Sequence, residues 1–246
     1  MCGRASQDGF VFFMRVPSVS LLVYHAAPAL VKPPDRGYTR EKRKGGARVE
    51  LTWENLENAV RACRGCGLCE RRLHTVLGEG NPHAAVLFVG EGPGRQEDEQ
   101  GRPFVGPAGQ LLDRMLAAIS LTREMVYIAN IVKCRPPGNR EPTAAEAAAC
   151  LPYLRAQFVL IRPKILVCLG RTAAMHILRP DIRITRERGI WVEKKGTLIL
   201  PTYHPSALLR DETGQKKREA WQDLKSLREK MREMDLYPKE EKTWTQ

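Results

Sequence analysis

Four stretches of the chain are rich in Val, Ile and Leu, and three of them are nearly continuous apolar runs. Runs of this kind, bounded by Gly, Pro or Asn, are typical of strands buried on both faces of a sheet. Each run is followed by a segment of different periodicity, so the pattern predicts strands separated by helices. The four predicted strands are residues 84–90, 126–132, 164–170 and 197–203.

The segments between the strands show helical spacing. Residues 107–119 place apolar side chains on one face. Residues 143–161 begin with Thr143-x-x-Glu146, which predicts a capping box, and Pro152 is a candidate kink in this helix. A last amphipathic helix is expected at about 215–235, with a core-packing stripe made of Trp221, Leu224, Leu227 and Met231.

The alternation of strands and helices predicts an α/β fold: a three-layer α/β/α sandwich around a central, four-stranded, mainly parallel sheet. In such sheets a ligand lies beyond the carboxyl ends of the strands. Those ends fall at Gly90, residues 130–133, residues 170–171 and His204. We therefore expect the functional site in the loops that follow these positions.

Charge adds a candidate partner. The formal net charge is +12, and residues 1–50 contribute only +5 of it, so the body of the chain is basic as well. A basic body indicates a polyanionic partner, nucleic acid before membrane, although a soluble basic surface is the alternative. Residues 10–31 are apolar but interrupted, so they fall short of the ~20 clean apolar residues of a spanning helix. We expect a poorly ordered extension at 1–50, one domain at 51–236 and a tail at 237–246, acting as a monomer.

The seven cysteines indicate a metal site. An odd number without a convincing export signal argues for a reducing, cytoplasmic compartment and against disulfides. Cys63 and Cys66 form a C-x2-C pair, and fifteen residues separate Cys134 from Cys150. Four thiolates suit zinc or an iron–sulfur cluster, and spacing does not choose between these two or exclude unligated thiols. Cys69 is interpreted as a spare thiol and Cys168 as a small buried apolar residue.

An acidic, glycine-rich loop follows the first strand. Its sequence, GEGPGRQED, is not a dinucleotide-binding G-x-G-x-x-G, because position 95 is Arg. The glycines allow the backbone to approach a ligand closely, and Glu91, Glu97 and Asp98 add negative charge.

Four collinear motifs together carry a family resemblance. They are CRGC, GEGPGRQEDEQGRPFVGPAGQLLDRML, NIVKCRPPGNREP with the later Cys150, and PTYHPSALLR. These motifs resemble the family 4 (thermostable, iron–sulfur) uracil-DNA glycosylases over about residues 62–227. The resemblance implies a prokaryotic, nucleoid-associated repair enzyme that flips uracil out of DNA and hydrolyses its N-glycosidic bond. It also implies a [4Fe–4S] cluster on Cys63, Cys66, Cys134 and Cys150.

The resemblance assigns roles to residues at the strand ends. His204 is expected to stabilise the departing uracil anion by a hydrogen bond, and Asn130 to recognise O4 and N3–H of the base. Phe104 is expected to stack on the flipped base. Glu91 is expected to orient or deprotonate the attacking water, while Gly92 brings the backbone close to the base.

Other assignments concern selectivity and DNA. Glu97 is expected near C5 of uracil, where it excludes the methyl group of thymine, and it is also the alternative residue for the water. In the HPSALLR segment, Leu208 is the expected wedge in the minor groove, with Arg210 and Ser206 on phosphates.

Basic residues around the cysteines suggest that the cluster braces a DNA-facing surface. They are Arg64, Arg71, Arg72, Lys133, Arg135 and Arg140. Two rival functions are an inactive iron–sulfur DNA-binding module and an iron–sulfur electron carrier, the latter supported only by CRGCGLC.

Overall fold

The computed structural model describes residues 50–237. Residues 1–49 of the expected extension and residues 238–246 of the expected tail lie outside the described part. The strands are β1 (Glu79–Gly80), β2 (Val86–Gly90), β3 (Tyr127–Asn130), β4 (Ile165–Leu169), β5 (Val192–Lys194) and β6 (Thr197–Thr202). The α-helices are α1 (Trp53–Arg61), α2 (Arg95–Gln100), α3 (Pro107–Ala117), α4 (Ala144–Ile161), α5 (Arg171–Ile177), α6 (Ile184–Glu187), α7 (Pro205–Leu209) and α8 (Gln215–Glu233). Short 3-10 helices are η1 (Gly67–Glu70), η2 (Arg123–Met125) and η3 (Pro137–Asn139).

The central sheet contains the four predicted strands. Within the described residues its order is β1-β3-β2-β4-β6-β5, and the inner strands β3, β2, β4 and β6 are parallel. Two short edge strands, β1 and β5, pair antiparallel and raise the strand number from the predicted four to six. They have two and three residues and are not fully buried, so they lack the apolar runs that identified the inner strands.

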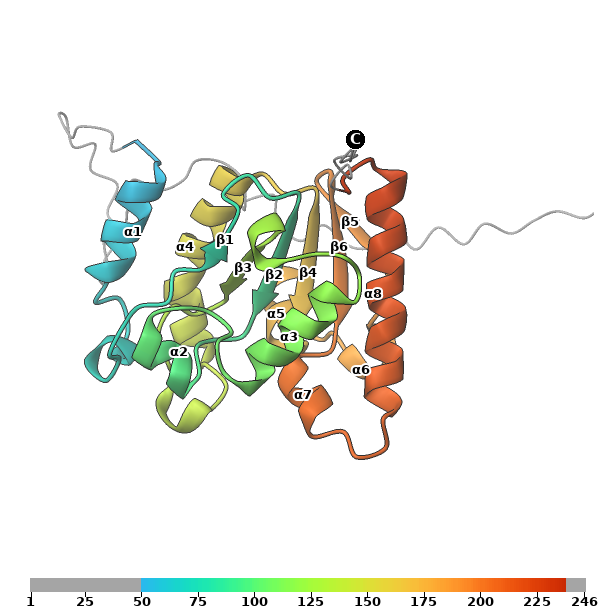
Figure 1. The fold of residues 1–246 in the computed structure, drawn as a ribbon. Coiled ribbons are helices and arrows are strands. Elements are labelled where there is room, and N and C mark those ends of the chain that lie inside the picture. Colours follow the sequence, from blue (N-terminus) through green and yellow to red (C-terminus); the bar gives the residue numbers. More distant parts are fainter. Residues whose placement is uncertain (1–49, 238–246) are drawn as a thin grey trace, which may run out of the picture.

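Helices cover both faces of the sheet, which confirms the three-layer α/β/α architecture (Figure 1). Alternate side chains of each strand enter different cores because successive residues of a strand point to opposite faces. Leu87 and Val89 pack with α1, α4 and α5, whereas Val86 and Phe88 pack with α3, α7 and α8.

Two helices illustrate how far the patterns hold. The Thr143 capping box is present: its hydroxyl accepts from the Glu146 amide at 3.2 Å, and Glu146 accepts from the Thr143 amide at 2.7 Å. Helix α4 continues through Pro152 and is long and apolar enough to cross a membrane by composition alone, yet one side of it is buried in the core.

In α8 the prediction for Trp221 was wrong. Its side chain is 39% exposed because Ala220 takes the core-facing position.

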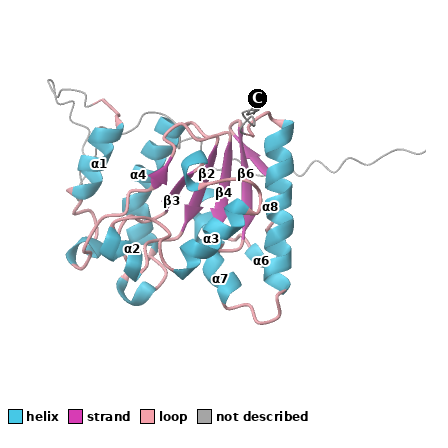
Figure 2. Cartoon of the chain, in the orientation of Figure 1, coloured by secondary structure: helices cyan, strands magenta, loops and turns pink. Residues whose placement is uncertain are grey.

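The parallel strands end at one edge of the sheet, the lower edge in Figure 2. The acidic loop with α2, the loop containing η3, the start of α5 and the start of α7 all follow strand ends. The topology therefore gathers the motif-bearing loops at one place.

Candidate active site

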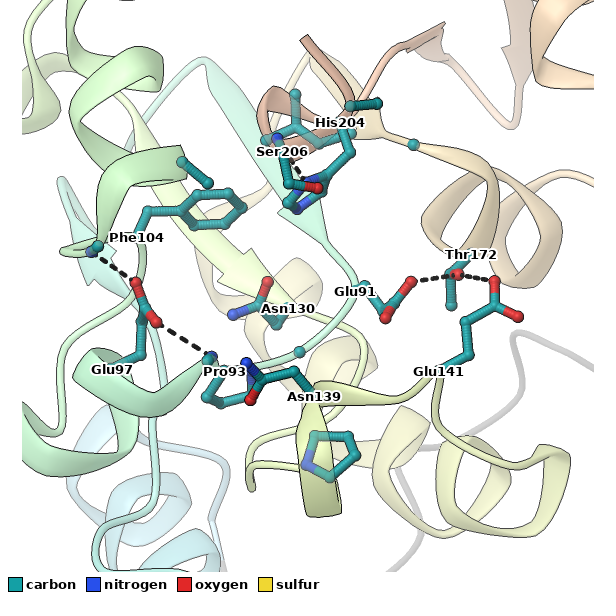
Figure 3. Close-up of a pocket in the computed structure, with 18 of the residues that line it drawn as sticks. Glu91, Pro93, Glu97, Phe104, Asn130, Asn139, Glu141, Thr172, His204 and Ser206 are labelled. Atoms are coloured by element: carbon teal, nitrogen blue, oxygen red, sulfur yellow. Dashed lines mark hydrogen bonds between the residues drawn. The ribbon is translucent and has the colours of Figure 1, made fainter. Parts of the chain in front are cut away.

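A pocket of about 600 Å³ lies among these loops (Figure 3). It collects side chains from all four inner strand ends, which agrees with the place expected from the sheet topology. The predicted site residues that line it are Glu91, Gly92, Glu97, Phe104, Asn130, His204, Ser206 and Arg210.

Asn130 has a polar atom with no partner. The side chain ends β3 and is 2% exposed, and within residues 50–237 its Oδ1 has no hydrogen-bond partner. Such an atom is uncommon in a folded protein and costs about 1–3 kcal/mol. Gly90 makes room for it, since a Cβ there would lie 2.5 Å from both Asn130 Oδ1 and the Phe104 ring. Asn130 therefore lines the pocket with an acceptor that no described residue satisfies.

Phe104 forms one wall of the pocket. Its backbone adopts a left-handed conformation (φ 53°), which a bulky residue rarely takes. Arg123 holds this turn by donating to the carbonyl oxygens of Pro103, at 2.9 Å, and of Phe104. The ring centroid lies 5.6 Å from that of His204. An aromatic face is thus fixed beside the imidazole.

Glu97 holds the pocket loops together. Its carboxylate accepts from the amides of Gly94 at 3.0 Å, Val105 at 2.9 Å and Gly106 at 2.8 Å. Both oxygens are therefore engaged, one of them next to the Phe104 turn. Asp98, the next residue, accepts from the backbone amide of Leu73 at 3.0 Å.

The Glu91 carboxylate has fewer hydrogen bonds to the protein than that of Glu97. Thr172 donates to it, with 2.6 Å between Thr172 Oγ1 and Glu91 Oε2. Burial raises the pKa of Glu91, and the negative charge of Glu141 raises it further, while the Thr172 hydrogen bond opposes the change. A carboxylate with a raised pKa is a better proton acceptor, so Glu91 suits the role of a general base.

His204 is held as a neutral imidazole. Burial, reinforced by Arg210, lowers the pKa of His204 to about 4. Its Nδ1 accepts from the Ser206 amide at 3.1 Å and lies 2.8 Å from Ser206 Oγ. Because Nδ1 is an acceptor, the ring proton resides on Nε2. The imidazole is thus a neutral N–H donor, already oriented.

The prediction for Leu208 as a wedge was wrong. Leu208 is 2% exposed and belongs to the core formed with α3 and α8, whereas the adjacent Leu209 is 44% exposed. The HPSALLR segment forms α7, a helix with one buried and one open side, so neighbouring leucines face different surroundings.

The four predicted ligand cysteines border one small cavity, together with Cys69. We call Cys63, Cys66, Cys134 and Cys150 the four-cysteine site. Among the residues described, no group of three His, Cys, Asp or Glu has the arrangement of a site for a single metal ion. Cys168 is fully buried, as expected of an apolar position.

Nitrogen donors surround the sulfurs. Cys63 accepts from the Gly65 amide at 3.3 Å, Cys134 from the Arg72 guanidinium at 3.2 Å and Cys150 from the Lys133 amide at 3.2 Å. Burial raises the pKa of Cys150 to about 12. A thiolate in such a place would need a positive group to balance it. Four cysteine sulfurs with nitrogen donors around them are the type of ligand that an iron–sulfur cluster takes.

Lys133 does not face DNA, which corrects one of the basic-surface assignments. It is 1% exposed, and its ammonium donates to the Asn130 carbonyl at 2.8 Å and to Gln157 Oε1 at 2.5 Å. Its position directly after a strand end, among motif residues, does not distinguish an exposed from a buried ammonium.

Thr172 and Glu141 are among the polar residues of the pocket that the sequence reasoning missed. Thr172 Oγ1 lies 2.8 Å from Glu141 Oε1, and Glu141 pairs with Arg171 at 3.2 Å. The signal for Thr172 was available, since it lies directly beyond the strand end at 170–171, in the zone where ligands of parallel sheets bind.

Comparison with known proteins agrees with this geometry. Residues 77–225 match the model of the Uracil DNA glycosylase superfamily. The chain is 42% identical over 189 residues to a Type-4 uracil-DNA glycosylase of Thermotoga maritima, an alignment that covers 76% of this chain and 94% of the relative. A Type-4 uracil-DNA glycosylase of Archaeoglobus fulgidus is 47% identical over 167 residues, which cover 63% of this chain and 84% of that protein. These matches show that the chain, which has the strand-end pocket and the four-cysteine site, belongs to the uracil DNA glycosylase superfamily and, within it, to the type-4 uracil-DNA glycosylases.

Proposed function

We propose that this protein is a uracil-DNA glycosylase of base excision repair. It takes a uracil that has left the DNA stack into the pocket and hydrolyses the C1′–N1 bond, leaving an abasic site. The observation that carries the proposal is the buried Oδ1 of Asn130 without a partner, beside Phe104 and His204. Uracil N3–H donates to that oxygen, and the Asn130 amide donates to uracil O4. Cytosine offers the reversed pattern and leaves both groups unpaired.

The departing base leaves as a uracil anion. The Nε2–H of His204 donates to uracil O2, where the charge develops. A neutral donor that is already oriented strengthens its hydrogen bond as the bond breaks, and such donors contribute about 2.7–4 kcal/mol. Phe104 stacks on the ring and repays part of the few kcal/mol needed to remove the nucleotide from the duplex.

Glu91 activates the attacking water. Its carboxylate offsets the positive charge on the sugar and accepts a proton from the water that attacks C1′. The alternative residue, Glu97, has both oxygens on backbone amides, which favours Glu91 for this step. Glu97 instead fixes the pocket wall, where it can still exclude the methyl group of thymine.

DNA is the partner of the basic surface. Leu209, exposed on α7, takes the wedge role that Leu208 cannot fill, and Arg210 and Ser206 lie next to it for phosphate contact. The protein's +12 charge predicts binding that weakens with salt through counterion release.

The four-cysteine site would hold a [4Fe–4S] cluster. When bound, the cluster neutralises the thiolates and joins the loop after α1 to the loop after β3 and to α4. The Arg72 guanidinium and the amides of Gly65 and Lys133 supply hydrogen bonds to the sulfurs, as is common around such clusters. Hydrolysis of the glycosidic bond requires no electron transfer.

A uracil-release assay tests the function. Purified protein is incubated with single- and double-stranded oligonucleotides that carry one uracil, thymine or cytosine, and free base and abasic sites are measured. We expect release of uracil alone, lost in Glu91→Gln. DNA binding without release would support the inactive module instead, and neither binding nor release would support the electron carrier.

A further inference from the structure

The Thr172 hydroxyl lies between two carboxylates. Its Oγ1 is 2.6 Å from Glu91 Oε2 and 2.8 Å from Glu141 Oε1 (Figure 3). The side chain is 2% exposed. A threonine hydroxyl has one hydrogen to donate and can accept two hydrogen bonds. It cannot donate to both carboxylates at once, so the second close contact is attractive only when one carboxyl carries a proton.

The two carboxylates line the same pocket but differ in burial. Burial is the main cause of the raised pKa of Glu91. The Glu141 side chain is 51% exposed and pairs with Arg171, itself 51% exposed. The three side chains therefore form a continuous hydrogen-bonded path from Glu91 to the half-exposed Glu141 carboxylate, which is open to solvent.

We propose that Thr172 and Glu141 relay the proton that Glu91 takes from the attacking water. The inference rests on the proposed function, in which Glu91 is the base. The water oxygen bonds to C1′ as its proton passes to Glu91 Oε. Glu91 then gives this proton to Thr172 Oγ1 while the Thr172 hydrogen passes to Glu141, which releases it to solvent. The path returns Glu91 to its ionised form, and the uracil anion takes its own proton from solvent.

The charges around Glu91 make the path testable. The Glu141 carboxylate raises the pKa of Glu91, whereas the Thr172 hydrogen bond and the Arg171 guanidinium lower it. The other charged groups of the pocket have their own partners. Glu97 binds backbone amides, Arg140 pairs with Glu146, and Arg95 pairs with Glu99. His204 is neutral near pH 7, and Arg210 acts on His204.

Two variants shift the pH profile in opposite directions. Glu91 is active when ionised, so the rate rises with pH through its pKa. Glu141→Gln removes a negative neighbour, lowers the pKa of Glu91 and moves this rise to lower pH. Thr172→Val removes a hydrogen bond to the carboxylate, raises that pKa and moves the rise to higher pH. Both variants interrupt the path, so both also lower the plateau rate, by about a hundredfold, the lower end of the range for acid–base catalysis.

The experiment is single-turnover uracil release at saturating protein, from pH 4.5 to 9, on a single-stranded uracil oligonucleotide so that base flipping does not limit the rate. Thr172→Ser keeps the hydroxyl and should restore the plateau and the wild-type profile. Thr122→Val and Glu124→Gln, outside the pocket, are matched controls. Thermal melting and binding of the same oligonucleotide show whether each variant is folded.

The outcomes separate the relay from its premise. Normal plateaus and unshifted profiles in both Thr172→Val and Glu141→Gln, with Glu91→Gln inactive, would overturn the relay and leave Glu91 as the base. Shifts in the same direction, or a Thr172→Ser variant as slow as Thr172→Val, would likewise reject it in favour of a packing role. A fully active Glu91→Gln would remove the relay together with the assignment of Glu91.

Discussion

Replacing His204 by alanine removes the hydrogen bond donor that we propose for the departing base. The imidazole is fixed by the Ser206 amide at Nδ1 and is flanked by Phe104. Because it is held in position before the reaction, the protein spends no free energy in orienting it at the transition state. Its removal should therefore slow bond cleavage and leave ground-state binding of DNA nearly unchanged.

The expected size follows from this geometry. One preorganised donor contributes about 2.7–4 kcal/mol, which corresponds to a loss of roughly a hundredfold to a thousandfold in the rate of base release. His204→Gln keeps an N–H donor on a side chain of similar reach and should lose less. Ser206→Ala removes only the hydroxyl near Nδ1, and the backbone amide still fixes the tautomer, so its rate should stay within a few-fold of the wild type.

The assay is single-turnover uracil release, with DNA binding measured separately so that chemistry and affinity are not confused. With a pKa of about 4, His204 is neutral throughout pH 5–9. A charged imidazole would instead give a rate that falls as pH rises through its pKa. The wild-type profile should show no such fall near neutral pH, and its rise at acid pH should belong to Glu91.

Two results would refute this reasoning. A near-normal rate in His204→Ala would show that the departing anion is stabilised elsewhere. The second result is a wild-type rate that falls between pH 6 and 8, together with loss of this fall in His204→Ala. It would show that the imidazole acts in its charged form.

Three further predictions concern other parts of the molecule. Purified protein should be brown. Alanine at any member of the four-cysteine site should remove the colour, whereas Cys69→Ala should keep it. A colourless protein with stoichiometric zinc would contradict the cluster. Leu209→Ala should reduce uracil release from duplex DNA more than from single strands, because a wedge matters only where a base stack must open. Leu208→Ala should instead lower the melting temperature of the protein. Equal losses of Leu209→Ala on both substrates would reject the wedge. The unfolded chain binds a proton at His204 below pH 6.5, whereas the folded chain binds it only below about pH 4. The free energy of unfolding should therefore fall by about 3 kcal/mol from pH 6.5 to 4, at 1.36 kcal/mol per pH unit. Denaturant titration should show a smaller fall in His204→Ala but an unchanged fall in the control His83→Ala, at an exposed histidine.

The inner sheet could be predicted because its strands are buried on both faces, so their residues are almost all apolar. The edge strands could not, since β1 and β5 are short and in contact with solvent, and nothing in their composition separates them from loops. The pocket residues followed from one topological rule, that parallel strands bring their carboxyl ends to the same edge. Glu91, Asn130 and His204 were therefore expected together although they are far apart in the chain.

Side-chain direction was harder to predict. Leu208 and Leu209 occupy adjacent positions of one motif, and only the packing of α7 against α3 and α8 shows which of them is open. Thr172 and Glu141 come from α5 and from the loop after η3, and no local pattern connects them. Their contact with Glu91 depends on how three loops pack, which periodicity and motif spacing do not determine.

The residues around β3 link the pocket to the four-cysteine site. Asn130 lines the pocket, and Lys133, three positions later, donates from its ammonium to the Asn130 carbonyl and from its amide to Cys150 Sγ. Cys134 follows directly and accepts from Arg72. Lys133 therefore connects the backbone of Asn130 to a sulfur of the four-cysteine site, through one hydrogen bond from its ammonium and another from its amide. We therefore expect that loss of the proposed cluster would affect the reaction mainly through a misplaced Asn130 rather than through a missing chemical step.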